Sequence, residues 1–264
     1  MMTSRKMSVS DPWAHLRTFT RARIALGRTG ISLPTEEVLN FGYAHAMARD
    51  AVHRPLDQAD FCRSLEAAGF EVVQVRSAAP DRPTYLLRPD LGRQLDPGSI
   101  STLQADARHG CDVLLVVGDG LSSLAVGNHA QPVLEQLRAI FPPAWRVGPV
   151  VVATQARVAL SDAIGELMQA KVVVMLIGER PGLTSPDSLG IYMTFGPSVG
   201  RQDGERNCIY NVRPEGLDYR TAARKTHWLV NESMRLKLSG VALKDESDVM
   251  EISGTDIPGL SDQR

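Results

Sequence analysis

The sequence predicts an α/β fold in which a Rossmann-like, mostly parallel sheet carries helices on both faces and follows a small helical N-terminal lobe. Continuously apolar runs such as CDVLLVVGDG (111–120) and KVVVMLIG (171–178) are typical of strands buried on both sides. Segments with helical character separate these runs, and strand–helix–strand alternation indicates parallel strands. A composition of 43% apolar and 22% charged residues is that of a globular protein with a sizeable core.

Residues 1–70 are predicted to form the N-terminal lobe. The stretch LPTEEVLNFGYAHAMARDAV (33–52) favours a helix that Thr35 caps, with Glu36 and Glu37 at its positive end. The stretch LDQADFCRSLEAAGF (56–70) favours a second helix that begins near Asp57 and ends near Gly69.

Residues 71–240 are predicted to form the Rossmann-like domain, and residues 241–264 a polar, flexible tail. Extended segments are expected at 71–76, 84–88, 111–120, 147–155, 171–178, 189–196 and 206–212. Helices are expected at 96–110, at 121–141 with an irregularity at Gly127 or Pro132, at 161–170 with Ser161 or Asp162 as cap, and from about 218 to 238.

Composition and cysteine usage exclude several classes of function. The net charge of −1 and the 5% aromatic content argue against a nucleic-acid surface. The three cysteines form no C-x-x-C pair, so neither a disulfide framework nor a zinc site is expected, and a reduced, cytoplasmic compartment fits. No apolar run is long enough for a membrane span, and the N-terminal residues lack the apolar core of a secretory signal.

Two apolar runs end in polar turns, where the crevice rule for parallel sheets places ligands. In GDGLSS (118–123) the glycines only partly match the dinucleotide fingerprint. Two interpretations stay open: a tight turn in which Asp119 or Ser122 caps the next helix, or a binding site for a phosphate or other polar ligand at the start of that helix. In GERPGL (178–183), Glu179 either accepts hydrogen bonds from a ligand or forms an ordinary ion pair. Cys208 is interpreted as a small apolar residue rather than a nucleophile.

Several stretches, in this order, together resemble the light chain of ethanolamine ammonia-lyase. They are RIALGRTG (23–30), YLLRPDLGRQL (85–95), VVGDGLSSLAV (116–126), IGERPGLTSPDSLGIYMTFGP (177–197) and ERNCIYNVRPEGLDYRTAA (205–223). The resemblance covers roughly residues 12–240.

The resemblance implies a subunit of an adenosylcobalamin-dependent lyase that converts ethanolamine to acetaldehyde and ammonia. The heavy chain would carry the substrate site, and cobalamin would lie between the two chains of a hetero-oligomer of heavy–light pairs. Cobalamin contacts carry over to Val158 in RVALSDAIGE, to Glu179 in GERPGL and to Cys208 in RNCIYN. No catalytic residue and no metal ligand is expected in this chain. Some light chains are packaged in a bacterial microcompartment, which the resemblance leaves open here.

Two other functions stay open at this stage. One is a stand-alone nucleotide-dependent enzyme, in which the GDGLSS turn would hold a pyrophosphate. The other is a non-catalytic interaction subunit. The chain lacks the D-x-H-x-x-G motif of many cobalamin mutases, so a bound cobalamin is expected to keep its own lower base.

Overall fold

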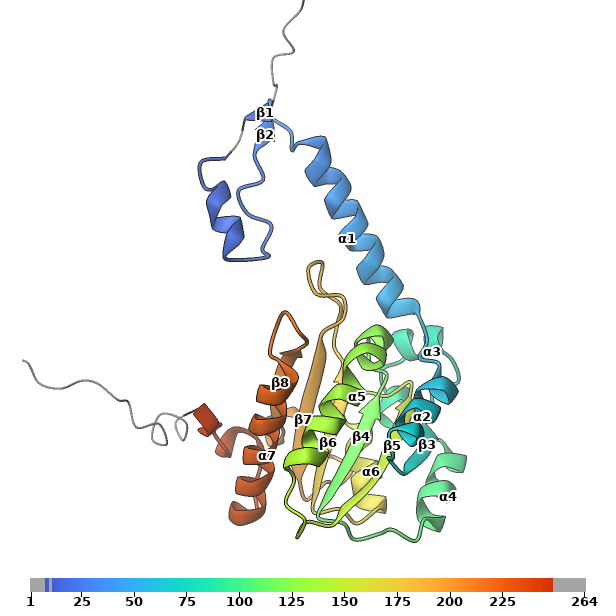
Figure 1. The fold of residues 1–264 in the computed structure, drawn as a ribbon. Helices are drawn as coiled ribbons and strands as arrows, with labels where there is room; N and C mark the ends of the chain where they lie inside the picture. The colour runs from blue at the N-terminus through green and yellow to red at the C-terminus, as the bar shows by residue number, and fades with distance from the viewer. Residues whose placement is uncertain (1–7, 10, 249–264) are drawn as a thin grey trace, which may run out of the picture.

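The computed structural model describes residues 8–9 and 11–248 and is built on a six-stranded sheet. The strands lie in the order β3 (Val72–Arg76), β5 (Val147–Thr154), β4 (Val113–Gly118), β6 (Val172–Gly178), β7 (Leu189–Phe195) and β8 (Asn207–Val212). Figure 1 shows this sheet with helices packed along it. The predicted α/β class is therefore confirmed.

The sheet is mixed rather than wholly parallel. Strands β3, β5, β4 and β6 are parallel, whereas β7 runs antiparallel to β6 and β8 antiparallel to β7. The connections at 179–188 and 196–206 contain no α-helix, and a parallel pairing requires a longer crossover. The prediction of a mostly parallel sheet holds, but the structure does not confirm the label Rossmann-like.

Helices cover the two faces of the sheet unequally. One apolar cluster joins the sheet to α2 (Gln58–Ala67), α5 (Ser123–Ile140) and α7 (Tyr219–Leu236). A second cluster joins the other face to α4 (Pro97–Ala105) and α6 (Leu160–Leu167). None of the helices in the described residues combines the length and apolar character that crossing a membrane requires.

Several local predictions hold, and others need correction. Asp57, Asp96 and Asp218 cap α2, α4 and α7 with their side chains. The segment 84–88, predicted as a strand, instead forms the end of the helix α3 (Arg82–Leu87) and its C-cap Arg88, because Asp81 caps the helix and a proline occupies its first turn.

Other helix boundaries were placed wrongly. Ser161 and Asp162 lie inside α6, whose N-cap is Ala159. Thr35 is the first residue of α1 (Thr35–His53) rather than its cap, which is Pro34. α5 continues through Pro132, so the expected irregularity does not end the helix.

The N-terminal part of the chain extends away from the sheet. It comprises β1 (Ser8–Val9), the short 3-10 helix η1 (Ala14–Thr18), β2 (Arg28–Thr29) and α1, and Figure 1 shows α1 projecting from the body of the molecule. α2 instead contributes Phe61 and Leu65 to the apolar cluster of the sheet. A separate lobe spanning residues 1–70 is therefore not confirmed.

The domain division at residue 70 and the flexible tail stay predictions. Within the predicted tail, Leu243 is buried, and Asp245 and Asp248 both pair with Lys225 of α7. The remaining residues, 249–264, lie outside the part of the chain that the structure describes.

Two glycines allow the end of β6 to press against the turn after β4. A Cβ atom at Gly178 would lie 2.0 Å from the carbonyl oxygen of Ser122. Gly120 has φ +57°, and a Cβ atom there would lie 2.1 Å from the carbonyl oxygen of Gly178. Side chains are excluded at both positions, so the two loops that follow β4 and β6 are held together.

We expect Gly178→Ala to lower the free energy of unfolding by at least about 2 kcal/mol, because the methyl group would displace backbone atoms. Gly127→Ala is the matched control. Gly127 lies within α5, and a Cβ atom there would meet nothing within 4 Å, so alanine should stabilise the helix by roughly 0.5–1 kcal/mol. Urea denaturation of the two variants measures both effects, and equal destabilisation would contradict the packing argument.

Candidate functional site

Val158 and Glu179 line the same cavity, of about 390 Å³, at the carboxyl edge of the parallel strands. Val158 lies in the loop after β5, and Glu179 directly follows β6; both strands flank β4. Tyr85, Arg157 and Tyr192 also line this cavity. Both residues therefore lie where the crevice rule expects a ligand, and their contact with one stays a prediction.

One oxygen of the Glu179 carboxylate accepts hydrogen bonds from the protein, and the other accepts none from the described residues. Oε2 accepts hydrogen bonds from the Ser188 hydroxyl and, at 3.4 Å, from the backbone N–H of Asn211. Across the described residues, no hydrogen bond reaches Oε1 and no ion pair involves Glu179. The alternative of an ordinary ion pair, which the sequence left open, is not what the structure contains.

Cys208 lies on the face of the sheet rather than at its carboxyl edge. It pairs in register with Tyr192 of β7, which in turn pairs with Met175 in the middle of β6. The Tyr192 hydroxyl and the Cys208 sulfur are close enough for each to shift the pKa of the other. Cys208 thus reaches the cavity through Tyr192, and the expectation that it would stand in the crevice needs this correction.

The pKa of the Cys208 thiol is raised. Although the residue is exposed on the sheet face, the groups packed around its sulfur remove water from it, and this desolvation is the main cause; the Tyr192 hydroxyl opposes the shift, and the nearby Glu179 carboxylate adds to it. Burial likewise raises the pKa of the Tyr192 hydroxyl above its ordinary value. A thiol that resists ionisation is a poor nucleophile, which agrees with the interpretation of Cys208 as non-catalytic.

The face of the sheet around Cys208 carries little cover. Cys208 and Tyr210 are exposed on the same side of β8, and Tyr192 is partly exposed beside them. α6 packs against β6 on this side, and Thr194 farther along β7 is fully buried. Sequence reasoning missed both tyrosines, although the two-residue period of a strand puts Tyr210 on the face of Cys208.

A buried ion pair lies beside the cavity. Arg82 Nη1 is 3.3 Å from Asp119 Oδ2 and donates to the Gly120 carbonyl at 2.7 Å. Asp119 Oδ1 accepts from the backbone N–H of Ala156, two residues before Val158. Burial raises the pKa of Asp119, and Arg82 opposes that shift. The pair fixes the loops that line the cavity.

The loop 179–188, between β6 and β7, is tied down by a second polar cluster. Asp187 accepts from Arg213 at 3.0 Å and contacts His129 Nε2 at 3.2 Å, while His129 Nδ1 is 2.8 Å from the Tyr219 hydroxyl. Burial opposes ionisation of Asp187, yet Arg213 and His129 hold its pKa below the ordinary value. The far end of the loop that begins with Glu179 is thereby held by α5, by the start of α7 and by the residue after β8.

The GDGLSS turn is filled by the protein itself. Ser122 caps α5 by accepting from the Ala125 N–H, and its hydroxyl donates to the Pro186 carbonyl. Gly120 lies against the end of β6, and Asp119 is committed to Arg82. The cap interpretation holds for Ser122, and this packing disfavours the turn as a pyrophosphate cradle.

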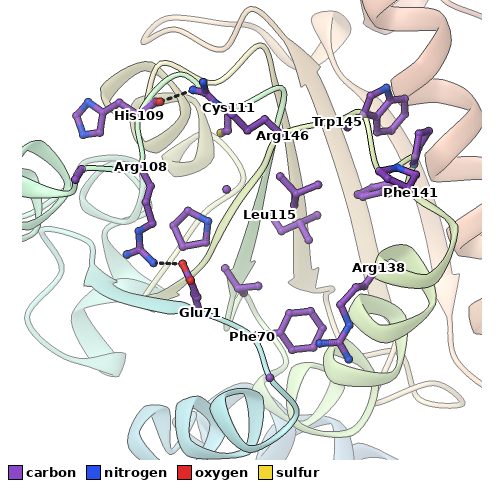
Figure 2. A pocket seen from close by; sticks show the side chains of 18 residues that line it. Phe70, Glu71, Arg108, His109, Cys111, Leu115, Arg138, Phe141, Trp145 and Arg146 are labelled. Atoms are coloured by element: carbon purple, nitrogen blue, oxygen red, sulfur yellow. Dashed lines mark hydrogen bonds and ion pairs between the residues drawn. The ribbon is translucent and has the colours of Figure 1, made fainter.

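A larger cavity, of about 720 Å³, lies at the opposite, amino edge of the sheet (Figure 2). Its arginines are bonded within the chain: Arg108 to Glu71, Arg146 to the His109 and Gly110 carbonyls, and Arg138 over the Phe70 ring. None of the predicted site residues lines it. Its guanidinium groups therefore serve the fold.

Comparison with known proteins identifies the family. The model of the family described as "Ethanolamine ammonia-lyase light chain (EutC)" matches residues 10–244. A protein of Azotobacter vinelandii (strain DJ) named ethanolamine ammonia-lyase small subunit is 51% identical over 257 residues, which cover 96% of this chain and 95% of that protein.

Relatives with the same name occur in Pseudomonas. The Pseudomonas aeruginosa (strain LESB58) protein is 52% identical over 251 residues, covering 94% of this chain and 92% of that protein. The Pseudomonas putida (strain KT2440) protein is 50% identical over 262 residues, covering 97% and 95%. The resemblance drawn from the motifs is confirmed, and this chain belongs to the ethanolamine ammonia-lyase light chain family.

Proposed function

We propose that this chain is the light subunit of an adenosylcobalamin-dependent ethanolamine ammonia-lyase and holds one side of the cobalamin. The observation that carries this proposal is the unoccupied Glu179 Oε1 on a cavity shared with Val158, beside the uncovered sheet face of Cys208. The heavy chain would carry the substrate site, and the pair would form a hetero-oligomer in the cytoplasm.

The chemistry of these residues fits a corrin. A corrin is flat, with an apolar face and a rim of amides, and the exposed side of β7 and β8 is a flat surface bearing Tyr210 and Cys208. Glu179 Oε1 suits an amide N–H, and the Arg157 side chain beside it suits an amide carbonyl.

The loop that carries Val158 contains two further signs of a ligand site. Gln155 has φ +54°, a strained value for a residue with a side chain, and its buried Oε1 has no hydrogen-bond partner in the described part of the chain. Arg157 Nε is also buried without a partner there. Unsatisfied buried polar atoms are costly and call for an explanation, which a bound ligand would supply here.

The size of the cavity supports a shared site. A space of about 390 Å³ suits a small ligand and can accept only an edge of a molecule as bulky as cobalamin. The remainder of the cofactor would have to be enclosed by another chain. This is the arrangement expected of a light subunit whose partner carries the reaction.

Under this proposal, the residues of this chain bind and orient the cofactor and exclude water from one side of it. When bound, the cofactor supplies a cobalt–carbon bond whose homolysis provides the radical for the lyase reaction. Glu179 would fix the rotation of the corrin in its plane through an amide, while Val158 and Tyr192 would pack against it. Removing water from this side protects reactive species from quenching. No acid or base group of this chain takes part.

The activity test is co-expression with the heavy chain from the same organism. We expect ammonia release from ethanolamine that requires added adenosylcobalamin and both chains, and no turnover by either chain alone. Turnover by the isolated light chain would contradict the proposal. So would a complex that forms normally yet never takes up cobalamin, which would favour a non-catalytic interaction subunit.

Glu179→Gln should weaken cobalamin binding to the heavy–light complex roughly tenfold. The glutamine NH2 group would take the place of the acceptor Oε1, so the N–H of the corrin amide would face a donor instead of an acceptor. Folding should change little, since glutamine can still accept from Ser188 and the Asn211 N–H. Spectroscopic titration of the complex with cobalamin gives the dissociation constant. Glu66→Gln, an exposed position on α2, is the control, and equal affinity of both variants and wild type would remove Glu179 from the site.

Bound cobalamin should slow modification of Cys208 by a thiol reagent at least about tenfold. Cys208 is the exposed cysteine of the chain, whereas Cys62 and Cys111 are buried. The reaction is followed by mass spectrometry of the light chain in complexes with and without cofactor, because the heavy chain alone would also shield the face. Cys208→Ala should abolish the labelling, and equal rates with and without cobalamin would place the cofactor elsewhere.

A further inference from the structure

The Glu179 carboxylate is held by two separate segments of the chain. Ser188, the residue before β7, donates its hydroxyl to Oε2, and the Asn211 N–H in β8 donates to the same oxygen at 3.4 Å. The backbone N–H of Glu179 also donates to the Ser188 carbonyl at 3.0 Å. The position of the other carboxylate oxygen, Oε1, therefore depends on how these two segments lie relative to each other.

An ion pair joins the same two segments. Asp187, the residue before Ser188, has its Oδ1 atom 3.0 Å from Nη1 of Arg213. Arg213 in turn lies two residues beyond Asn211. Its side chain is only 4% exposed, so salt in the solvent screens this pair weakly. The pair thus fixes the distance between the two segments that donate hydrogen bonds to the glutamate.

The strand β8 carries a bulge at the point where it meets the glutamate. The register between β7 and β8 shifts between Leu189 and Ile191, so two residues of β8 face the single residue Gly190. Such a bulge re-aims the strand that contains it. Asn211, one of the two residues, has φ +59°, a value that is uncommon for a residue with a side chain and that asparagine tolerates best. The backbone that donates to Glu179 is therefore specially shaped.

Gly190 leaves the room that the Glu179 side chain occupies. A Cβ atom at position 190 would lie 2.9 Å from Oε1 and 3.1 Å from Cγ of Glu179. It would also lie 3.0 Å from Cε2 of Tyr192, which lines the same cavity as the glutamate. The carboxylate is therefore confined on both sides, because two donors hold one oxygen and the Gly190 backbone lies beside the other.

We infer that Asp187 and Arg213 are positioning residues, which act on the cofactor through Glu179 by holding together the two segments that bond to its Oε2. The inference rests on the proposed function, because only that function gives Glu179 a cofactor amide to contact. Hydrogen bonds weaken steeply outside a narrow range of distance and angle, so a small displacement of Oε1 would weaken this contact. An ion pair that served the fold alone would not affect cofactor affinity through Glu179.

The test is a double-mutant cycle between Asp187→Asn and Glu179→Gln, measured as the dissociation constant of cobalamin for the purified heavy–light complex. Asp187→Asn alone should raise the dissociation constant about fivefold, because the two segments can then move apart. In the Glu179→Gln complex the same change should raise it less than about twofold, since the contact that it disturbs is already lost. The same fold-change in both complexes would mean a merely structural role and would overturn the inference.

Asp112→Asn is the matched control. The Asp112 side chain is 21% exposed, against 22% for Asp187, and it pairs with Lys171 at 2.7 Å. It lies directly before β4, at the amino edge of the sheet, far along the strands from Glu179. This variant therefore loses an equally exposed carboxylate and should bind cobalamin as wild type does. An equal loss of affinity in both variants would contradict a role that is specific to Asp187.

A second variant covers the case in which Asp187→Asn, by leaving Arg213 buried without its partner, prevents folding. Asp187→Glu keeps the negative charge, and its additional methylene group should displace the neighbouring Ser188. We expect the dissociation constant of cobalamin to rise about threefold in this variant, and not in combination with Glu179→Gln. A dissociation constant equal to that of wild type would overturn the inference.

The outcomes separate this inference from the proposed function. If Glu179→Gln weakens binding while both Asp187 variants bind cobalamin as wild type does, the positioning role is wrong and the proposed function stands. If the wild-type complex takes up no cobalamin, the proposed function fails and the inference fails with it.

Discussion

The buried pair of Arg82 and Asp119 is the interaction on which the carboxyl edge of the sheet depends. Removing one partner of such a pair leaves a charge buried alone, at a cost of about 3–5 kcal/mol. Arg82 also donates to the carbonyls of Val52 and Gly120, and Asp119 accepts from the Ala156 N–H. Two side chains thus join the end of α1, the turn after β4 and the loop after β5. These contacts fix the segments that line the cavity relative to one another.

The same pair accounts for two of the charged groups beside the cavity, which neutralise each other instead of facing a ligand. Tyr85 lies between two guanidinium groups, 4.9 Å from Arg82 and 4.4 Å from Arg157, and its hydroxyl donates to the Ala156 carbonyl. Several polar groups beneath the cavity are therefore satisfied by one another, whereas Arg82 Nη2, Gln155 Oε1 and Arg157 Nε are buried without a partner in the described residues. What remains for a ligand is one oxygen of Glu179, part of Arg157 and an uncovered sheet face. Under the proposed function, these groups would meet the amide rim and the flat face of the cofactor.

Much of this arrangement followed from the sequence, and the exceptions have physical causes. Apolar runs predicted β4, β5 and β6, and three predicted helices begin near the aspartates that cap them in the structure, because both signals are local. The segment 84–88 was assigned to a strand on its β-prone residues, yet the Asp81 cap and Tyr85 packing make it α3. The direction of β7 and the position of Cys208 depend on pairing between strands, which no local pattern encodes. Tyr192, the link between Cys208 and the cavity, became visible only once that pairing was known.

Three incomplete features of the chain meet at one loop. The cavity is too small for its proposed ligand, Cys208 and Tyr210 on the sheet face of β8 are exposed, and so are Leu39, Tyr43 and Met47 on α1. Residues 179–188 connect these features, since Glu179 borders the first and Thr184 lies beside the third. The cluster of Asp187, His129 and Arg213 fixes this loop in the isolated chain. A single partner that binds at the loop would cover all three features at once, so three separate binding partners are not required. Because the loop is already ordered, little conformational entropy would be lost when that partner binds.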